Sequence, residues 1–334
     1  MTEPRPRGEF DWIARLVEIL GDSAREAIGD DTAVVEREGR ALAWTIDTLV
    51  EGVHFRFDWF DPAAIGRRAL VASLSDLAAT GARPLAALVS AAGSRATVAA
   101  RIEGIYEGLR AAADEAACAV VGGDLARAEG PLHLTVTALG EIAGQPLRRG
   151  GVRAGDEIWV TGALGGPAAA VALLGAASPE LIPDLRDHPA YARLAAPRAR
   201  NAEVRWLLDH AEIHAAIDVS DGVSGDAGHL AERSGVRIVL EPDRLPLHPG
   251  AMLAARALGV DPGEWALHGG EEFELLLSAP PAALERQAER FSARFGIPLT
   301  RIGEAHLGAG LFARKGGRVE RLDPASWDHF ADGA

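Results

Sequence analysis

One stretch of the chain constrains its fold more than any other, because a strand pattern there leads directly into a carboxylate. In Ala41–Phe55, read ALAWTIDTLVEGVHF, the first residues alternate with the two-residue period of a β-strand. One face carries Leu42, Trp44 and Ile46, and the other carries Ala41, Ala43 and Thr45. The strand is expected to end at Asp47, where a partly dehydrated carboxylate needs a positive partner. A divalent cation with oxygen ligands is one candidate, and a carboxylate that caps a turn is the simpler alternative.

Three further segments place acidic side chains beside apolar strands. Ile28–Asp31 is a glycine turn with two adjacent carboxylates. The short apolar strand 119–121 is expected to lead into Gly122-Gly123-Asp124, and the strand 213–217 into Asp218-Val219-Ser220-Asp221-Gly222. Adjacent like charges repel each other, so such groups are either well solvated or held by a cation.

A fourth acidic side chain lies inside a predicted helix. The helix begins at Asp61-Pro62, as N-cap and first residue, and runs to about Thr80. Its second half is apolar nearly all round, which implies burial. Asp76 is the only charged residue between Arg68 and Arg83. An isolated carboxylate in a buried helix is costly, so Asp76 is expected either to bond a neighbouring loop or to coordinate a metal ion.

Convergence of these carboxylates would require cations. The set is Asp31, Asp47, Asp76, Asp124, Asp218 and Asp221. Mg²⁺ would neutralise them and normally takes substrate phosphates into its coordination shell. The only lysine, Lys315, lies in no P-loop, so phosphate charge would be neutralised by arginine, backbone N–H groups or metal ions. The residues alone therefore predict a metal-rich nucleotide enzyme and leave its acceptor open.

Composition and length limit the number of domains, the fold class and the partners that this chain can have. The 334 residues suggest two domains, and the turn Gly144–Pro146 is the expected boundary, giving domains 1–143 and 144–334. Strands and helices alternate in both halves, which predicts α/β or α+β layers. The net charge of −14 argues against a nucleic-acid or anionic-membrane partner. A single cysteine, Cys118, excludes an internal disulfide and fits a reducing cytoplasm. No signal core and no membrane span are expected.

Motifs along nearly the whole chain resemble, in order, those of the thiamine-monophosphate kinase family. They are GEF at 8–10, IGDD at 28–31, TIDTLVEGVHF at 45–55, LSDLAATGA at 74–82, GGD at 122–124, DVSDG at 218–222, GGEEFEL at 269–275 and WDHF at 327–330. The wider superfamily includes aminoimidazole ribonucleotide synthetase, selenophosphate synthetase and a hydrogenase-maturation protein. The resemblance implies two layered α/β domains, ATP bound across them, and a homodimer joined by the N-terminal sheets.

The resemblance also implies a reaction and a set of site residues. ATP would transfer its γ-phosphoryl group onto thiamine monophosphate, and no general base would be needed because the acceptor oxygen is already ionised. The Mg²⁺ ligands would be Asp31, Thr45, the Ile46 carbonyl, Asp47, Asp76, Asp124, Asp218 and Asp221. ATP would contact Tyr106, Gly123, Asp124, Arg149 and Ser220. The thiamine moiety would contact His54, Glu271 and Trp327.

The chain departs from the family pattern at several positions. Ile46 replaces an expected Thr, which a backbone ligand tolerates; Leu125-Ala126 replaces a polar pair, and Glu272-Phe273 replaces Asp-Tyr. The alternatives are another ATP-dependent enzyme of the superfamily and a non-catalytic metal-binding protein. The selenophosphate and hydrogenase-maturation enzymes would be expected to carry a reactive cysteine near one end, where this chain has none.

Overall fold

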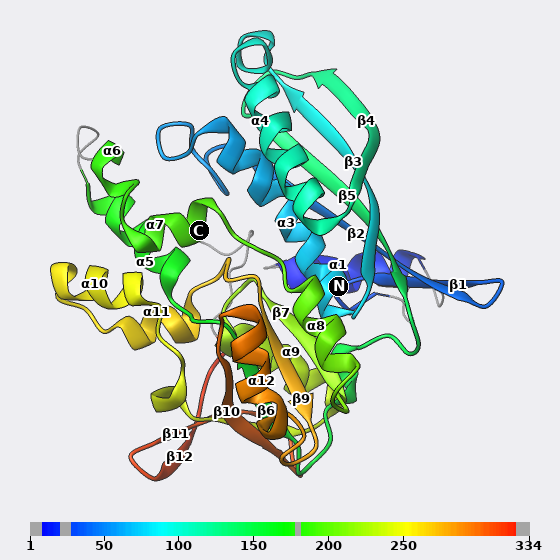
Figure 1. Ribbon diagram of the computed structural model, residues 1–334, viewed down its shortest axis with the longest axis vertical. Helices are drawn as coiled ribbons and strands as arrows, with labels where there is room; N and C mark the ends of the chain where they lie inside the picture. The colour runs from blue at the N-terminus through cyan, green and yellow to red at the C-terminus, as the bar shows by residue number, and fades with distance from the viewer. Residues whose placement is uncertain (1–8, 21–27, 178–181, 325–334) are drawn as a thin grey trace, which may run out of the picture.

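Figure 1 shows a computed structural model, which describes residues 9–20, 28–177 and 182–324. The first half builds a five-stranded sheet in the order β1-β2-β5-β3-β4, with β3 and β4 parallel and the other neighbours antiparallel. Its elements are α1 (Glu9–Leu20), β1 (Ala33–Arg37), β2 (Arg40–Val50), α3 (Pro62–Ala79), β3 (Arg83–Gly93), α4 (Arg95–Ala116), β4 (Ala119–Arg127) and β5 (His133–Ile142).

The second half builds a seven-stranded sheet in the order β12-β11-β8-β10-β6-β9-β7, with β8 and β11 parallel. Its strands are β6 (Glu157–Thr161), β7 (Ala215–Val219), β8 (Arg237–Leu240), β9 (Glu274–Ala279), β10 (Leu299–His306), β11 (Gly310–Lys315) and β12 (Arg318–Arg321). Its helices are α5 (Gly166–Ala176), α6 (Ile182–Leu185), α7 (Pro189–Ala195), α8 (Asn201–Leu208), α9 (Val223–Ser234), α10 (Pro249–Leu258), α11 (Pro262–His268) and α12 (Glu285–Phe295), with short 3₁₀ turns η1 (Arg149–Gly151) and η3 (Pro242–Arg244).

The prediction of a mixed α/β chain with two sheets is confirmed, and the ends of three strands are corrected. Strand β7 runs from Ala215 to Val219 and so contains Asp218, where the sequence predicted an end at residue 217. β2 continues past Asp47 to Val50, and β4 continues past Asp124 to Arg127. Both strands run on because β5 and β3 supply hydrogen-bonding partners along their full length. The pattern of residues 173–197 suggested one short helix and a loop, whereas the chain there completes α5 and forms α6 and α7. No helix among the described residues is long and apolar enough to cross a bilayer.

Helix α3 lies at the centre of the molecule, which explains why its sequence is apolar nearly all round. It packs on β2 and β5 of the first sheet and against α4, and its far end meets β7, β9 and α8 of the second half (Figure 1). Its side chains Leu70 and Leu74 belong to the core under the first sheet, whereas Ala78 and Ala79 belong to the core beside α12. Polar side chains in its second half reach both sheets, since Ser73 donates to Asp47 in β2 and Ser75 donates to Asp218 in β7.

Two glycines allow α3 and α4 to pack closely. A Cβ atom at Gly66 would lie 1.8 Å from the Ile105 carbonyl oxygen, and one at Gly108 would lie 1.8 Å from the Ala63 carbonyl oxygen. The obstruction at both positions is backbone, which cannot rotate away as a side chain would. Any side chain here must push the helices apart.

The variant Gly108→Ala is expected to lower the free energy of unfolding by about 2–3 kcal/mol, because the added methyl overpacks this crossing. Gly175, in α5, has open space at its Cβ position. Gly175→Ala is therefore the matched control, with an expected gain of about 0.5–1 kcal/mol from higher helix propensity. Urea denaturation followed by circular dichroism measures both changes. A Gly108→Ala protein as stable as its parent would contradict the close crossing.

Candidate active site

Three carboxylates from distant parts of the chain meet beside α3. Asp31 precedes β1, Asp76 lies on α3 and Asp218 lies in β7, and each offers a carboxylate oxygen within 4.8 Å of the others. Asp47 adjoins the group: its carboxylate accepts a 2.7 Å hydrogen bond from Ser73, also on α3. The convergence predicted from the sequence is therefore present for these acids.

Burial makes the negative charges costly. Desolvation, with the repulsion of Asp47, raises the pKa of Asp76 well above its ordinary value. Desolvation, with the repulsion of Asp31, raises the pKa of Asp218 to about 8. Hydroxyl groups offset part of the cost, since Thr45 donates to Asp76 and Ser75 donates to Asp218 at 2.7 Å. Such a group of oxygens is a ligand set suited to hard divalent cations.

One protein cation faces the cluster. The Nε atom of Arg149 donates to Asp31 at 3.2 Å, and its backbone N–H donates to Asp30 at 2.9 Å. Arg148 forms an ion pair with Asp30 at 3.0 Å. Asp30 and Asp31 are therefore held by two arginines from η1 and its N-cap, rather than solvated. Since Arg149 and Asp31 are 118 positions apart, the chain around Asp31 gave no sign of this partner.

The DVSDG turn extends the polar wall beyond Asp218. The Ser220 hydroxyl lies 3.4 Å from a carboxylate oxygen of Asp218. The charge of Asp221 adds to the field at Asp218. Gly270 packs against this turn so closely that a Cβ atom would lie 2.4 Å from the Ser220 carbonyl oxygen. The glycine pair 269–270 thus brings the following loop against the turn.

A cavity of about 1170 Å³ opens between the two halves of the chain beside these residues. Asp47, Asp76, Asp218 and Asp221 line one part of it. The other part is lined mainly by aromatic and apolar side chains together with a few polar ones, among them Phe55, Trp59, Phe60, Trp265, Phe273, His54, Arg68, His268 and Glu271. The cavity therefore has an anionic end suited to metal and phosphate and an aromatic end suited to a ring system.

Two of the three predicted thiamine contacts lie at the aromatic end. His54 follows β2, and its Nδ1 atom accepts a 3.0 Å hydrogen bond from the backbone N–H of Val50. Glu271 has a φ of 62°, a left-handed conformation unusual outside glycine, and its N–H donates to the Ser220 carbonyl oxygen at 2.6 Å. The third predicted contact, Trp327, lies outside the described residues.

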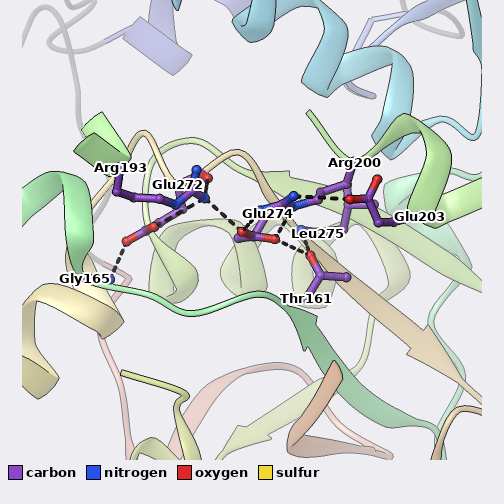
Figure 2. Close-up of polar contacts among 8 residues, drawn as sticks. All are labelled: Thr161, Gly165, Arg193, Arg200, Glu203, Glu272, Glu274 and Leu275. Carbon is purple, nitrogen blue, oxygen red and sulfur yellow. Dashed lines mark hydrogen bonds and ion pairs between the residues drawn. The ribbon is translucent and has the colours of Figure 1, made fainter. Parts of the chain in front are cut away.

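A buried ionic network anchors the strand that follows this loop (Figure 2). Glu274, in β9, accepts hydrogen bonds from Arg200 at 2.6 Å, Arg193 at 2.9 Å and Thr161 at 2.7 Å. Glu272 accepts from the backbone N–H of Gly165, and Arg193 also donates to the Glu272 carbonyl oxygen. Segments from α7, α8, β6 and β9 are thereby tied together underneath the loop.

Residues predicted to contact ATP divide between two regions. Arg149 and Ser220 lie at the carboxylate cluster, but Asp124 lies in β4 on the far edge of the first sheet. Its neighbour Gly123 shares a row with Val89, Val136 and Asp47, so Asp124 points to the opposite face from Asp47.

Gly123, Tyr106 and Ile46 are further residues predicted to contact ATP or a metal ion. A Cβ atom at Gly123 would lie 1.8 Å from the Val89 carbonyl oxygen, so only glycine fits there. Tyr106 is partly exposed on α4, which lies on the face of the sheet opposite to the one that Asp124 points to, and the Ile46 side chain is exposed on the same strand as Asp47. Within one chain, Asp124 therefore does not join the cluster of Asp31, Asp76 and Asp218.

Two further functional candidates were not predicted from the sequence. Arg68 is buried in the cavity wall, and Asp226, on α9, is buried near Asp218 with one carboxylate oxygen that has no hydrogen-bond partner in the described chain. Arg68 had no signal that set it apart, because its neighbour Arg67 also lies three and four residues before apolar side chains, those of Leu70 and Val71. Asp226 is set in a helix of ordinary polarity, which gave no such signal either.

Comparison with known proteins identifies the class. Residues 29–142 match the family model for the N-terminal domain of AIR synthase related proteins, and residues 153–314 match the model for their C-terminal domain. Solved structures of the hydrogenase-maturation protein HypE share the fold at about 20% identity, one with a TM-score of 0.69. The chain is a member of the AIR synthase related proteins.

Two curated relatives and one solved structure narrow this class. The thiamine-monophosphate kinase of Aquifex aeolicus is 34% identical over 97% of this chain and 98% of its own, and that of Salmonella typhimurium is 36% identical over the same shares. A structure described as AaThiL complexed with AMPPCP and TMP matches with a TM-score of 0.84 and 32% identity, covering 98% of this chain and 99% of that one. Within the class, this chain belongs to the thiamine-monophosphate kinase family.

The buried carboxyl of Glu272 should make stability depend on pH. Burial raises the pKa of Glu272 from 4.5 to about 8. Because the folded pKa is the higher one, the stabilisation is complete below 4.5 and is lost as the pH rises to about 8. Relative to Glu272→Gln, the parent should therefore lose stability across that window and then level off. Urea midpoints over a pH series measure this, with the exposed residue change Glu107→Gln as control. Parallel curves for the parent and Glu272→Gln would contradict the assignment.

Proposed function

We propose that this chain transfers the γ-phosphoryl group of ATP directly to the phosphate of thiamine monophosphate, forming thiamine diphosphate, with several Mg²⁺ ions. The observation that carries the proposal is the convergence of Asp31, Asp76 and Asp218 at one end of a cavity whose other end is aromatic. Membership of the family and the ligands named for the solved relative support the same reaction.

The donor set fits magnesium. It consists of carboxylate oxygens, with Asp47 and Asp221 beside the three converging acids and the Thr45 hydroxyl and the Ile46 carbonyl on the neighbouring strand. When bound, Mg²⁺ neutralises the phosphate charges that develop during phosphoryl transfer. Arg149 adds a fixed positive charge at the same end, and Ser220 adds a hydroxyl. The protein itself then aligns two phosphates, which suffices because the acceptor oxygen is ionised at neutral pH.

The thiamine moiety fits the aromatic end of the cavity. A thiazolium ring is cationic, and aromatic faces together with the Glu271 carboxylate would stabilise it. His54 lies at the same end. We extend the assignment to Trp327 on the strength of the family motif alone.

A coupled assay of ADP release tests the reaction. Release that requires thiamine monophosphate supports the proposal. Release that depends on a different acceptor would favour another enzyme of the superfamily, and metal binding without turnover would favour a non-catalytic metal-binding protein. The same preparation serves for all three outcomes.

The variant Asp47→Asn is expected to lower kcat by about 100-fold or more, because it removes a negative ligand at the phosphate-binding end while keeping the side-chain shape. Circular dichroism should show an unchanged fold. The matched control is Asp114→Asn, an exposed change on α4 that should leave kcat as it is. Near-parental turnover of Asp47→Asn would refute its role.

We also propose that the chain acts as a homodimer joined through the open face of the first sheet, and that the domains divide at 143/144, between the two sheets. Helices α3 and α4 cover one face of the sheet, whereas the other exposes Trp44 by 51%, Ile46 by 67% and Leu88 by 49%. Large apolar side chains gathered on one face favour an interface. Asp124 points to this face, and we propose that it serves the site of the partner subunit across the interface. A cytoplasmic location stays a prediction.

Mixed dimers test the shared site. Heterodimers of Asp47→Asn and Asp124→Asn chains, purified through two different tags, should have about half the parental activity, because one of two symmetric sites regains both carboxylates. Each homodimer should be inactive. Heterodimers as inactive as the homodimers would place Asp124 in its own subunit's site, and a monomer in sedimentation would overturn the interface.

A further inference from the structure

Arg68 is a buried cation that neither the motifs nor the expected reaction account for. It lies on α3 with 2% of its side chain exposed, among the largest fully buried side chains of the chain. Removing a guanidinium from water is costly unless several acceptors replace the water. Its partners therefore indicate what the residue does.

The partners come from three separate segments. Arg68 donates 2.9 Å and 3.0 Å hydrogen bonds to the carbonyl oxygens of Leu194, in α7, and His54, after β2. It also pairs with the carboxylate of Glu271. The guanidinium carbon lies 4.8 Å from the ring centre of Phe60. One planar side chain thus joins the turn after β2, helix α7 and the loop before β9.

Two of these segments carry the proposed thiamine contacts. His54 and Glu271 both line the aromatic end of the cavity, and Arg68 lies between them. The left-handed backbone of Glu271, with φ of 62°, is disfavoured on its own and persists only where neighbours hold it. The ion pair with Arg68 fixes the direction of the carboxylate, and the bond to the His54 carbonyl fixes the turn opposite.

The position of Arg68 along α3 separates it from the phosphate end. Arg68 and Asp76 are eight residues apart on one helix, which corresponds to about 12 Å along the axis. The same rigid helix therefore carries a carboxylate for the metal and phosphate end and a guanidinium for the ring end. A substitution of Arg68 should therefore weaken binding of the acceptor substrate and leave binding of the nucleotide unchanged.

We propose that Arg68 is a positioning residue that orients Glu271 and the His54 turn, and thereby sets the affinity for the thiamine moiety. This inference rests on the proposed function, since it takes His54 and Glu271 as the acceptor's contacts. Arg68 acts through these two residues. A planar guanidinium with several N–H donors is needed because three acceptors lie around it.

The test compares KM for the two substrates in Arg68→Gln, Arg68→Lys and Arg67→Gln. Arg67 is the matched control because it is the adjacent residue on the same helix and pairs with Glu115 instead. In Arg68→Gln the KM for thiamine monophosphate should rise by about 10- to 100-fold, the effect expected for a lost charged hydrogen bond, while the KM for ATP stays within about twofold. Arg68→Lys should give a smaller rise, and Arg67→Gln should leave both values unchanged.

A second variant separates positioning from general packing. If Arg68 acts through Glu271, adding Arg68→Gln to Glu271→Gln should cause little further rise in the KM for thiamine monophosphate. Fold-changes that multiply would overturn the inference, as would equal rises in both KM values. Thermal unfolding accompanies each variant, and failure of both Arg68→Gln and Arg68→Lys to fold would show a purely structural residue. A parent without thiamine-monophosphate-dependent ADP release would instead defeat the proposed function itself.

Discussion

The structure depends on holding several carboxylates together in a place that water hardly reaches. Asp31, Asp76 and Asp218 converge from three elements, and burial with mutual repulsion raises the pKa values of Asp76 and Asp218. Hydroxyl donors from β2 and α3 and one arginine offset only part of this cost. The free-energy cost of burying these carboxylates is explained if a bound ligand offsets it. Divalent cations, which also bind phosphates, are such a ligand.

The cavity has separate ends for phosphate groups and for a ring system, and both ends lie along helix α3. Its phosphate end is built from charge, with few apolar groups. Its ring end is built mainly from aromatic side chains, together with Glu271, which forms an ion pair with Arg68. The network of Glu274, Arg193 and Arg200 holds the start of β9, directly after the same loop (Figure 2). Because each buried charge there has an opposite charge beside it, the loop is held firmly enough to keep Glu271 in an unfavourable backbone conformation.

In strand β2 the largest apolar side chain, Trp44, lies on the face that α3 and α4 leave open. In β2 the covered face carries the small or polar Ala43, Thr45 and Asp47, whereas Trp44 and Ile46 face outward. This arrangement gives a close approach between α3 and the sheet on one side and a surface for a second subunit on the other. The position of Asp124 on that outer face connects the proposed dimer with the proposed chemistry.

The sequence by itself determined the local elements and the kinds of residue at the site. Helix α3 matches its predicted bounds, and acids in apolar segments marked Asp76 and Asp218 as unusual, because periodicity and burial cost are local properties. Only the tertiary structure decided which acids meet, that Arg149 pairs with Asp31, and that Arg68 rather than Arg67 is buried over the cavity. The alternating side chains of β2 showed that the strand has two distinct faces, but they did not show which face the helices cover. Those outcomes follow from strand order and helix packing between residues far apart in the chain, and no local pattern records them.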